Sequence, residues 1–240
     1  MMGGFGYHRE IIERFPGVRG SVIHATGLVN GPSLPELRSA YETEQKEVLG
    51  EIGDTQLSAI PSLGAWRRTF SSFGVKPTQY RNAAEALLRR LTKHGDVPSI
   101  NSLVDMANMV SIRYRLPVAV CDQRAVTGVT TVRFATGDER FTDIGSGETT
   151  TPEPGEVVFV DDDLLASARR WCWRQSAESA AGPQTEEAIF TIEAQHADGE
   201  SDVQRAADDL IRLLETFQTE AEVSHGYLSS ATPWFEWGPT

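Results

Sequence analysis

Apolar residues recur three and four positions apart over much of the first half of the chain, which is the spacing of an amphipathic helix. Residues 18–28 come before these helices, and their β-branched content predicts a strand. Four helices are predicted: from the capping box Ser33-Leu34-Pro35-Glu36 to Gly50 or Gly53, from Leu63 to Gly74, from about Tyr80 to His94, and from Asn101 or Ser102 onward.

Beyond Pro117 the apolar period changes to two, which is the period of a strand. Strands are predicted at Pro117–Cys121, Val129–Ala135, Glu156–Val160, Arg169–Arg174 and Ala188–Ala194, although the fourth could instead end a helix begun at Asp163. An amphipathic helix follows from about Asp202 to Ala221, and the tail SHGYLSSATPWFEWGPT is expected to pack as irregular coil. Because helices and strands do not alternate, the pattern favours an α+β fold over a doubly wound sheet.

The segment from Pro98 to Asp122 is the most informative, because polar residues stand inside its apolar pattern. Burying a polar group without a partner costs about 1–3 kcal/mol, so such residues are either hydrogen-bonded for structure or part of a site. The string I-N-x-x-V-D-x-x-N, followed by a Pro-led strand that ends in Asp, resembles the B3/B4 domain of the phenylalanyl-tRNA synthetase β subunit. It is formed by Ile100, Asn101, Val104, Asp105, Asn108, Pro117 and Asp122.

The resemblance implies one domain over residues 1–240, with a family core at about 73–194 and elaborations on both sides. It implies a largely antiparallel, barrel-like β core wrapped by helices. In the synthetase this domain hydrolyses tyrosine wrongly attached to tRNA(Phe). The present chain is shorter than that enzyme, so it is expected to be a free-standing, trans-acting editing factor.

Matched residue by residue, the resemblance implies a site that keeps part of the family pattern. Asn108 matches the family's Asn, and Glu193 matches its editing Glu by the apolar-apolar-Glu-Ala pattern, so these two are the expected catalytic residues. The family's Thr and His are replaced by Ala107 and Ala119, which is expected to enlarge the pocket for a side chain other than tyrosine. Without the His, the site has no obvious general base at pH 7.

The expected substrate-binding set comprises Asn101, Asp105, Ala107, Ala119, Trp173 and Arg174. Each member also has a structural interpretation. The first two could be helix caps or buried hydrogen-bonding groups, the tryptophan could be core packing, and the arginine could pair with an acid.

The formal net charge of −12 argues against a surface that is coated by nucleic acid, because phosphate binding depends on Lys and Arg. The charge is uneven along the chain, however. The stretch 67–93 contains seven basic residues and a single acidic residue, Glu85. Its cations are Arg67, Arg68, Lys76, Arg81, Arg89, Arg90 and Lys93. This cluster is either a solvated helix face or a patch that binds the tRNA acceptor end.

No metal site or cofactor is expected, because the five histidines are scattered and two cysteines cannot make a thiolate site. The run from Asp161 to Asp163 fits a turn better than a cation site. No apolar run reaches the ~20 residues that span a bilayer, and no signal peptide is recognised, so the cytoplasm is the expected location. The rival functions are a non-catalytic tRNA- or small-molecule-binding module and hydrolysis of another amino-acid-derived ligand.

Overall fold

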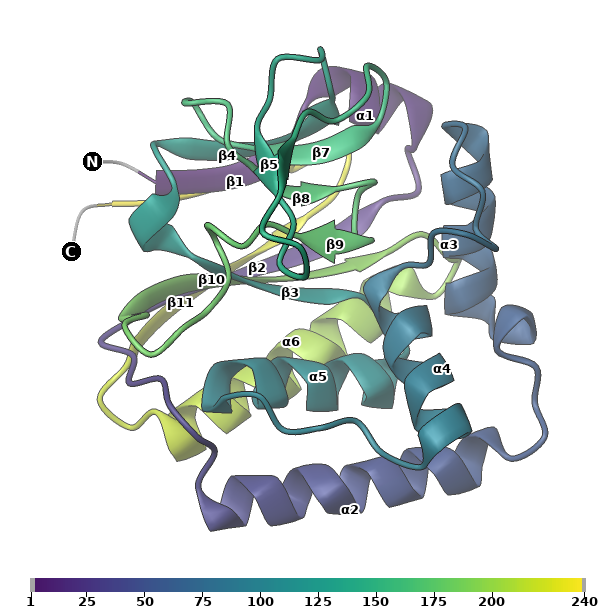
Figure 1. The fold of residues 1–240 in the computed structure, drawn as a ribbon, viewed down its shortest axis with the longest axis vertical. Helices are drawn as coiled ribbons and strands as arrows, with labels where there is room; N and C mark the ends of the chain where they lie inside the picture. The colour runs from purple at the N-terminus through teal and green to yellow at the C-terminus, as the bar shows by residue number, and fades with distance from the viewer. Residues whose placement is uncertain (1–2, 239–240) are drawn as a thin grey trace.

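The computed structural model describes residues 3–238. Two stacked sheets lie on top of a layer of helices, and one further helix stands at their side (Figure 1). The strands are β1 (Gly3–Tyr7), β2 (Arg19–Thr26), β3 (Val118–Asp122), β4 (Val129–Phe134), β5 (Phe141–Thr142), β6 (Thr149–Thr150), β7 (Val157–Val160), β8 (Ala166–Arg169), β9 (Arg174–Gln175), β10 (Glu187–Ala194), β11 (Glu222–Leu228) and β12 (Trp234–Trp237). The helices are α1 (Arg9–Arg14), α2 (Pro35–Ile52), α3 (Pro61–Ser72), α4 (Ala83–His94), α5 (Ser102–Tyr114) and α6 (Gly199–Phe217), with 3-10 turns η1 (Leu57–Ala59) and η2 (Gln123–Ala125).

The upper sheet has the strand order β12-β1-β4-β7-β8-β9, the lower sheet has the order β11-β2-β10-β3, and β5 and β6 form a small hairpin. Within residues 3–238, β1 and β4 are the only neighbouring strands that run parallel. The α+β class and the largely antiparallel sheet are therefore confirmed. The barrel-like core is wrong, because each large sheet ends in two open edges instead of closing on itself. No helix in this described part of the chain is long and apolar enough to span a membrane.

The lower sheet separates the two larger of three apolar clusters. Phe190 and Ile192 of β10 face the helical core, which α2, α4, α5 and α6 fill. Ile189 faces the other way, into a core shared with the upper sheet, α1 and α3. Because side chains alternate along a strand, Glu193 stands on the same face as Ile189.

The motif helix begins as expected, since the Asn101 Oδ1 accepts a hydrogen bond from the Val104 N–H at 3.0 Å. The predicted capping box at Ser33 is wrong. The Ser33 hydroxyl instead donates to Asp105 at 2.6 Å, and α2 begins after Leu34 without a side-chain cap. The long-range partner is a buried carboxylate, which binds the hydroxyl more strongly than a backbone N–H would.

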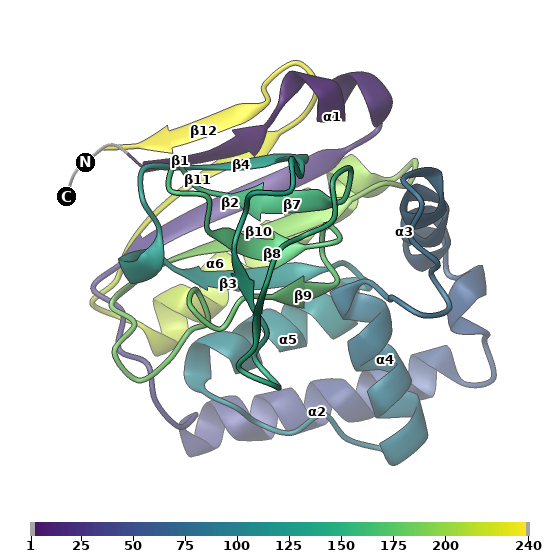
Figure 2. The same cartoon turned by 45° about the horizontal axis from the view of Figure 1, so that its top comes forward.

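The aromatic tail is not coil but forms β11 and β12, and β12 pairs with the unpredicted strand β1 (Figure 2). Glycines in β1 make this pairing possible. A Cβ at Gly3 would lie 2.4 Å from the Trp237 indole, and one at Gly6 would lie 2.3 Å from the Trp234 indole. The missing side chains therefore let both indoles lie against the strand, which places the two ends of the described chain side by side (Figure 2).

The predicted strand Arg169–Arg174 is interrupted. Arg169 ends β8, Arg174 begins β9, and residues 170–173 form a turn in which Arg170 and Trp171 take left-handed φ values of 46° and 63°. No helix starts at Asp163. The Asp161 carboxylate accepts hydrogen bonds from the backbone N–H groups of Thr127, Asp163 and Leu165, so the acidic run holds a turn.

Candidate functional site

A cavity of about 90 Å³ lies between the two sheets at the β8–β9 turn. The lower sheet contributes Ala119, Thr191 and Glu193, and the upper sheet contributes Phe159 and Ala168. The turn contributes Trp171, Cys172, Trp173 and Arg174, and the start of α4 contributes Ala83. The cavity is thus an apolar space with one carboxylate inside it.

Glu193 is the central group of this cavity and is 2% exposed. Its Oε1 accepts two hydrogen bonds, from the Tyr7 hydroxyl at 2.8 Å and from the Trp171 Nε1 at 2.9 Å. Its Oε2 makes no hydrogen bond to the described residues, yet this atom keeps some accessible surface. One oxygen is therefore fixed, and the other is left for a ligand or a water molecule.

Gly20 makes room for the Tyr7 hydroxyl. Gly20 is the direct antiparallel partner of Glu193, so a side chain at either position would point to the same face of the sheet. A Cβ at Gly20 would lie 2.4 Å from the Tyr7 hydroxyl oxygen. The absence of a side chain at Gly20 is thus what lets Tyr7 reach Glu193.

Trp171 is held from several sides. Its ring meets Phe15 and Trp66 edge to face, with centroid separations of 5.1 and 5.3 Å, and its backbone N–H donates to the Val157 carbonyl. The left-handed backbone at Trp171 costs energy, which the surrounding contacts must offset. The strain and the packing together aim the indole N–H at Glu193.

Burial raises the pKa of Glu193 to about 7, and the hydrogen bonds from Trp171 and Tyr7 keep the pKa from rising further. Burial and the neighbouring Glu193 raise the pKa values of Tyr7 and Cys172 well above their ordinary values. Near neutral pH, the group in this cavity that exchanges a proton is therefore Glu193. A carboxylate with a pKa of about 7 is suited to general base catalysis.

Arg174 stands at the mouth of the cavity beside Trp173, with its guanidinium carbon 4.7 Å from the indole centroid. Its guanidinium also pairs with Asp143. This pairing, together with hydrogen bonds from the backbone N–H groups of Ser146 and Gly145, lowers the pKa of Asp143 to about 2. Four predicted site residues therefore meet at one cavity: Ala119, Trp173, Arg174 and Glu193.

The expected convergence of Asn108 with Glu193 is wrong. Asn108 approaches the Tyr41 hydroxyl of α2 without forming a hydrogen bond of normal geometry. Tyr41 belongs to the helical core, whereas Glu193 stands on the opposite face of the lower sheet. Ala107 is also buried in the helical core, so it does not enlarge the cavity.

Asp105 and Asn101 are hydrogen-bonded within the fold. Asp105 is fully buried, and its carboxylate accepts from the hydroxyls of Ser33 and Ser99 and from the Ile100 N–H. The Asn101 Nδ2 donates to the Ala181 carbonyl at 3.1 Å. The motif polar residues thus connect α5 to the loops around it, and none of them lines the Glu193 cavity.

The predicted basic residues do not form one continuous groove. Arg67, Arg89, Arg90 and Lys93 line one groove between α4 and the η1–α3 region, together with His94. Arg67 and Arg81 pair with the buried Glu85, so they are partly neutralised. Lys76 lies in a different groove, beside Arg14 and Arg170, and Arg68 is exposed on α3.

Sequence reasoning missed Tyr7, Gly20 and the role of Trp171. Tyr7 lies in a glycine-rich stretch that carries no strand signal, and its partner Glu193 is remote in sequence. A signal for Trp171 was present in the sequence, because Trp171 and Trp173 flank Cys172. The left-handed turn, however, places the Trp171 indole against Glu193 and the Trp173 indole against the Arg174 guanidinium. No group of three or more metal-ligating side chains occurs in residues 3–238.

Comparison with known proteins gives a family match. The family model of the B3/4 domain matches residues 65–217, which is more than half of the chain. A search of curated proteins gives no significant match. A similar solved structure is an N-terminal fragment of the phenylalanyl-tRNA synthetase β-subunit from Pyrococcus horikoshii, at 8% identity and a TM-score of 0.46. That match covers 92% of this chain and 50% of the other, so this chain spans about half the length of that fragment. From the family match, the chain belongs to the B3/4 domain family.

Proposed function

We propose that this protein hydrolyses an aminoacyl ester on tRNA, with Glu193 as the general base. The observation that carries the proposal is the Glu193 carboxyl group, which has one oxygen fixed, one oxygen free and a pKa of about 7. Membership of a family that includes editing domains supports the choice of an aminoacyl ester as substrate. The raised pKa supplies a base where the family's His is replaced by Ala119.

In this mechanism the Glu193 Oε2 takes a proton from a water molecule as the water attacks the ester carbonyl. The tetrahedral intermediate then expels the ribose oxygen, which receives that proton from Glu193. Thr191 lies two residues earlier on the same face of β10, and its hydroxyl has no partner among the described residues. We assign this hydroxyl, in place of the Asn108 amide, as the donor to the developing oxyanion.

The cavity volume limits the amino acid. An apolar cavity of ~150 Å³ holds a benzene ring, and the cavity beside Glu193 is smaller, at about 90 Å³. The bulky rings of Trp171 and Phe159 line the same cavity as the small Ala119 side chain. The proposed substrate therefore carries a small side chain and not tyrosine.

A deacylation screen over mischarged tRNAs tests the proposal. Glu193→Gln keeps the shape of the side chain but cannot accept a proton, so it is expected to lower the rate by about 100-fold or more. Glu187→Gln is the control, because Glu187 lies on the same strand, is partly exposed and pairs with His24. Equal activity of wild type and Glu193→Gln on every substrate would contradict the proposal.

The second candidate role for Glu193 is to bind the ammonium of an amino acid, which would suit a binding module as well as an enzyme. The apolar walls favour it, because a buried carboxylate with a free oxygen attracts a cation. N-acetylated aminoacyl-tRNA separates the roles, since it keeps the ester and lacks the ammonium. A general base cleaves it, whereas an ammonium site neither binds nor cleaves it.

The groove of Arg67, Arg89, Arg90 and Lys93 is proposed to bind the tRNA backbone. It follows α4, and the first residue of α4, Ala83, lines the Glu193 cavity, ten residues or ~15 Å from Lys93. The double variant Arg89→Glu/Arg90→Glu should weaken tRNA binding, with a loss that shrinks at high salt. Arg205→Glu/Arg212→Glu on α6 is the matched control, since both side chains are 66% exposed.

A further inference from the structure

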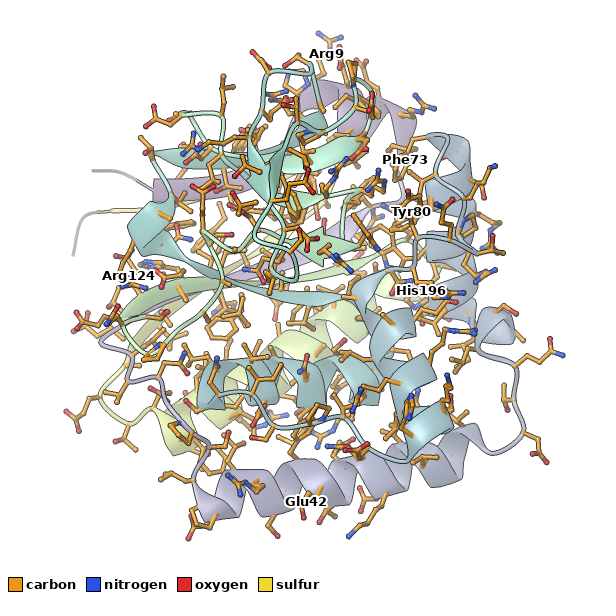
Figure 3. All side chains as sticks on the ribbon, in the orientation of Figure 1. Arg9, Glu42, Phe73, Tyr80, Arg124 and His196 are labelled. Carbon is orange, nitrogen blue, oxygen red and sulfur yellow. The ribbon has the colours of Figure 1, made fainter. Side chains whose placement is uncertain are left out.

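Two residues that line the cavity, Trp173 and Arg174, form a cluster of aromatic rings and guanidinium groups with Tyr80 and Arg170, which line a neighbouring groove. The Arg170 guanidinium carbon lies 4.0 Å from the Tyr80 ring centroid and 4.6 Å from the Trp173 ring centroid. The Arg174 guanidinium carbon lies 4.7 Å from the Trp173 centroid, so the Trp173 ring contacts both guanidinium groups. Figure 3 shows Tyr80, one member of this cluster, on the side of the molecule between β9 and α3.

The less exposed members of this cluster are held by contacts within the fold. The Arg170 side chain is 13% exposed and its Nη2 pairs with the Glu156 carboxylate at 2.9 Å. The Tyr80 and Trp173 rings meet edge to face at 5.0 Å. Because cation–π contacts strengthen when they are shielded from water, these contacts stabilise the position of the Arg170 side chain.

Arg174 is the outer member, and it is fixed in a different way. The Trp173 indole covers its guanidinium, and the Asp143 carboxylate pairs with its edge. Asp143 is itself held by the N–H groups of Gly145 and Ser146, at 2.8 and 3.1 Å. The Arg174 side chain is nevertheless 46% exposed, so a planar cation is oriented by the protein and still open to solvent.

We propose that the guanidinium of Arg174 is a stacking platform for the terminal nucleobase of the tRNA 3′ end. The proposal rests on the proposed function, because an ester held at Glu193 places the attached ribose at the cavity mouth, where Arg174 lies. A nucleobase stacks on an arginine plane as it does on an aromatic ring. The platform would bind the end of any tRNA and position its ester, whereas the cavity selects the amino acid.

Binding of two forms of one uncharged tRNA tests the platform: the complete molecule ending in adenosine and a form that lacks this last nucleotide. Stacking of one base is worth about 1–3 kcal/mol, so wild type should bind the complete form roughly 5- to 150-fold more tightly. Arg174→Lys keeps the charge and loses the plane, so it should bind both forms nearly equally. Arg140→Lys is the matched control, because Arg140 is 44% exposed and pairs with Glu178.

A fluorescent base makes the stacking directly visible. With 2-aminopurine as the terminal base, its emission should be quenched by wild type and by Arg140→Lys, and not by Arg174→Lys. Circular dichroism checks that each variant folds. Retained discrimination and quenching in Arg174→Lys would overturn the platform, and active deacylation in the same experiment would leave the hydrolase standing. Failure of wild type to bind either tRNA or to deacylate any would overturn both proposals.

Discussion

Substitution of Gly20 by Ala tests how the Glu193 carboxyl group is controlled, through a residue that touches no substrate. The new Cβ would lie 2.4 Å from the Tyr7 hydroxyl oxygen, which is closer than atoms approach, so the hydroxyl must move away from Glu193. Overpacking of this kind costs about 1–3 kcal/mol of stability. We expect the fold to survive this loss of stability, whereas the hydrogen bond from the Tyr7 hydroxyl to Glu193 is expected to break.

The magnitude follows from the lost hydrogen bond. A hydrogen bond to a charged group contributes about 1.5–3 kcal/mol, and one pKa unit corresponds to about 1.4 kcal/mol. Because the Tyr7 hydroxyl lowers the pKa of Glu193 from what burial alone would give, its loss should raise that pKa by about 1–2 units. At pH 7 the ionised fraction would then fall from about half to about 1–10%, with a matching fall in the rate of deacylation.

The assay is the pH dependence of deacylation from pH 6 to 9, together with titration of the Glu193 carboxyl carbon by NMR. Tyr7→Phe removes the hydroxyl without a clash and should shift both curves to higher pH by the same amount as Gly20→Ala. Gly17→Ala is the control, since a Cβ there meets no atom within 4 Å. If both site variants titrate as wild type does, Tyr7 does not control Glu193 and the reasoning fails.

Three further outcomes are expected. Glu193 has a raised pKa, so its contribution to stability is lost as the pH rises from about 4.5 to about 7; Glu193→Gln should match wild type at pH 4 and exceed it by up to about 3 kcal/mol at pH 8 in urea unfolding. Asn108→Ala should change the deacylation rate less than twofold, because Asn108 lies across the sheet from the cavity; a loss above tenfold in a folded variant would contradict this. Asp105→Ala should cost about 2–4 kcal/mol in the same unfolding experiment, because it strands two hydroxyls and a backbone N–H.

The sequence was most informative where local pattern and structure coincide. The alternation in Ala188–Ala194 places Glu193 on a sheet face, and β10 has that register. The capping Asn101 starts α5 as expected. In both cases the pattern is read over neighbouring residues, and neighbours alone set which side chains share a face.

The wrong predictions have a common cause. The spacing of polar residues along a helix does not tell which other element of the fold packs against them. Asp105 and Asn108 lie one turn apart on α5, and the sequence left open whether they face a site or another helix. The contact with Tyr41 and Ser33 depends on how α2 packs, which is decided over a long separation in sequence. The strand β1 was missed for a related reason, since its glycines lower strand propensity and its pairing with Trp237 is remote.

The pairing of the first and last strands has a consequence for the making of the protein. The backbone N–H of Tyr7 donates to the carbonyl of Pro233 at 2.9 Å, immediately before β12. Tyr7 is synthesised 226 residues before Pro233, so a nascent chain that has not reached β12 lacks this hydrogen bond on the strand that supplies a donor to Glu193. A copy interrupted before β12 would therefore lack the finished site.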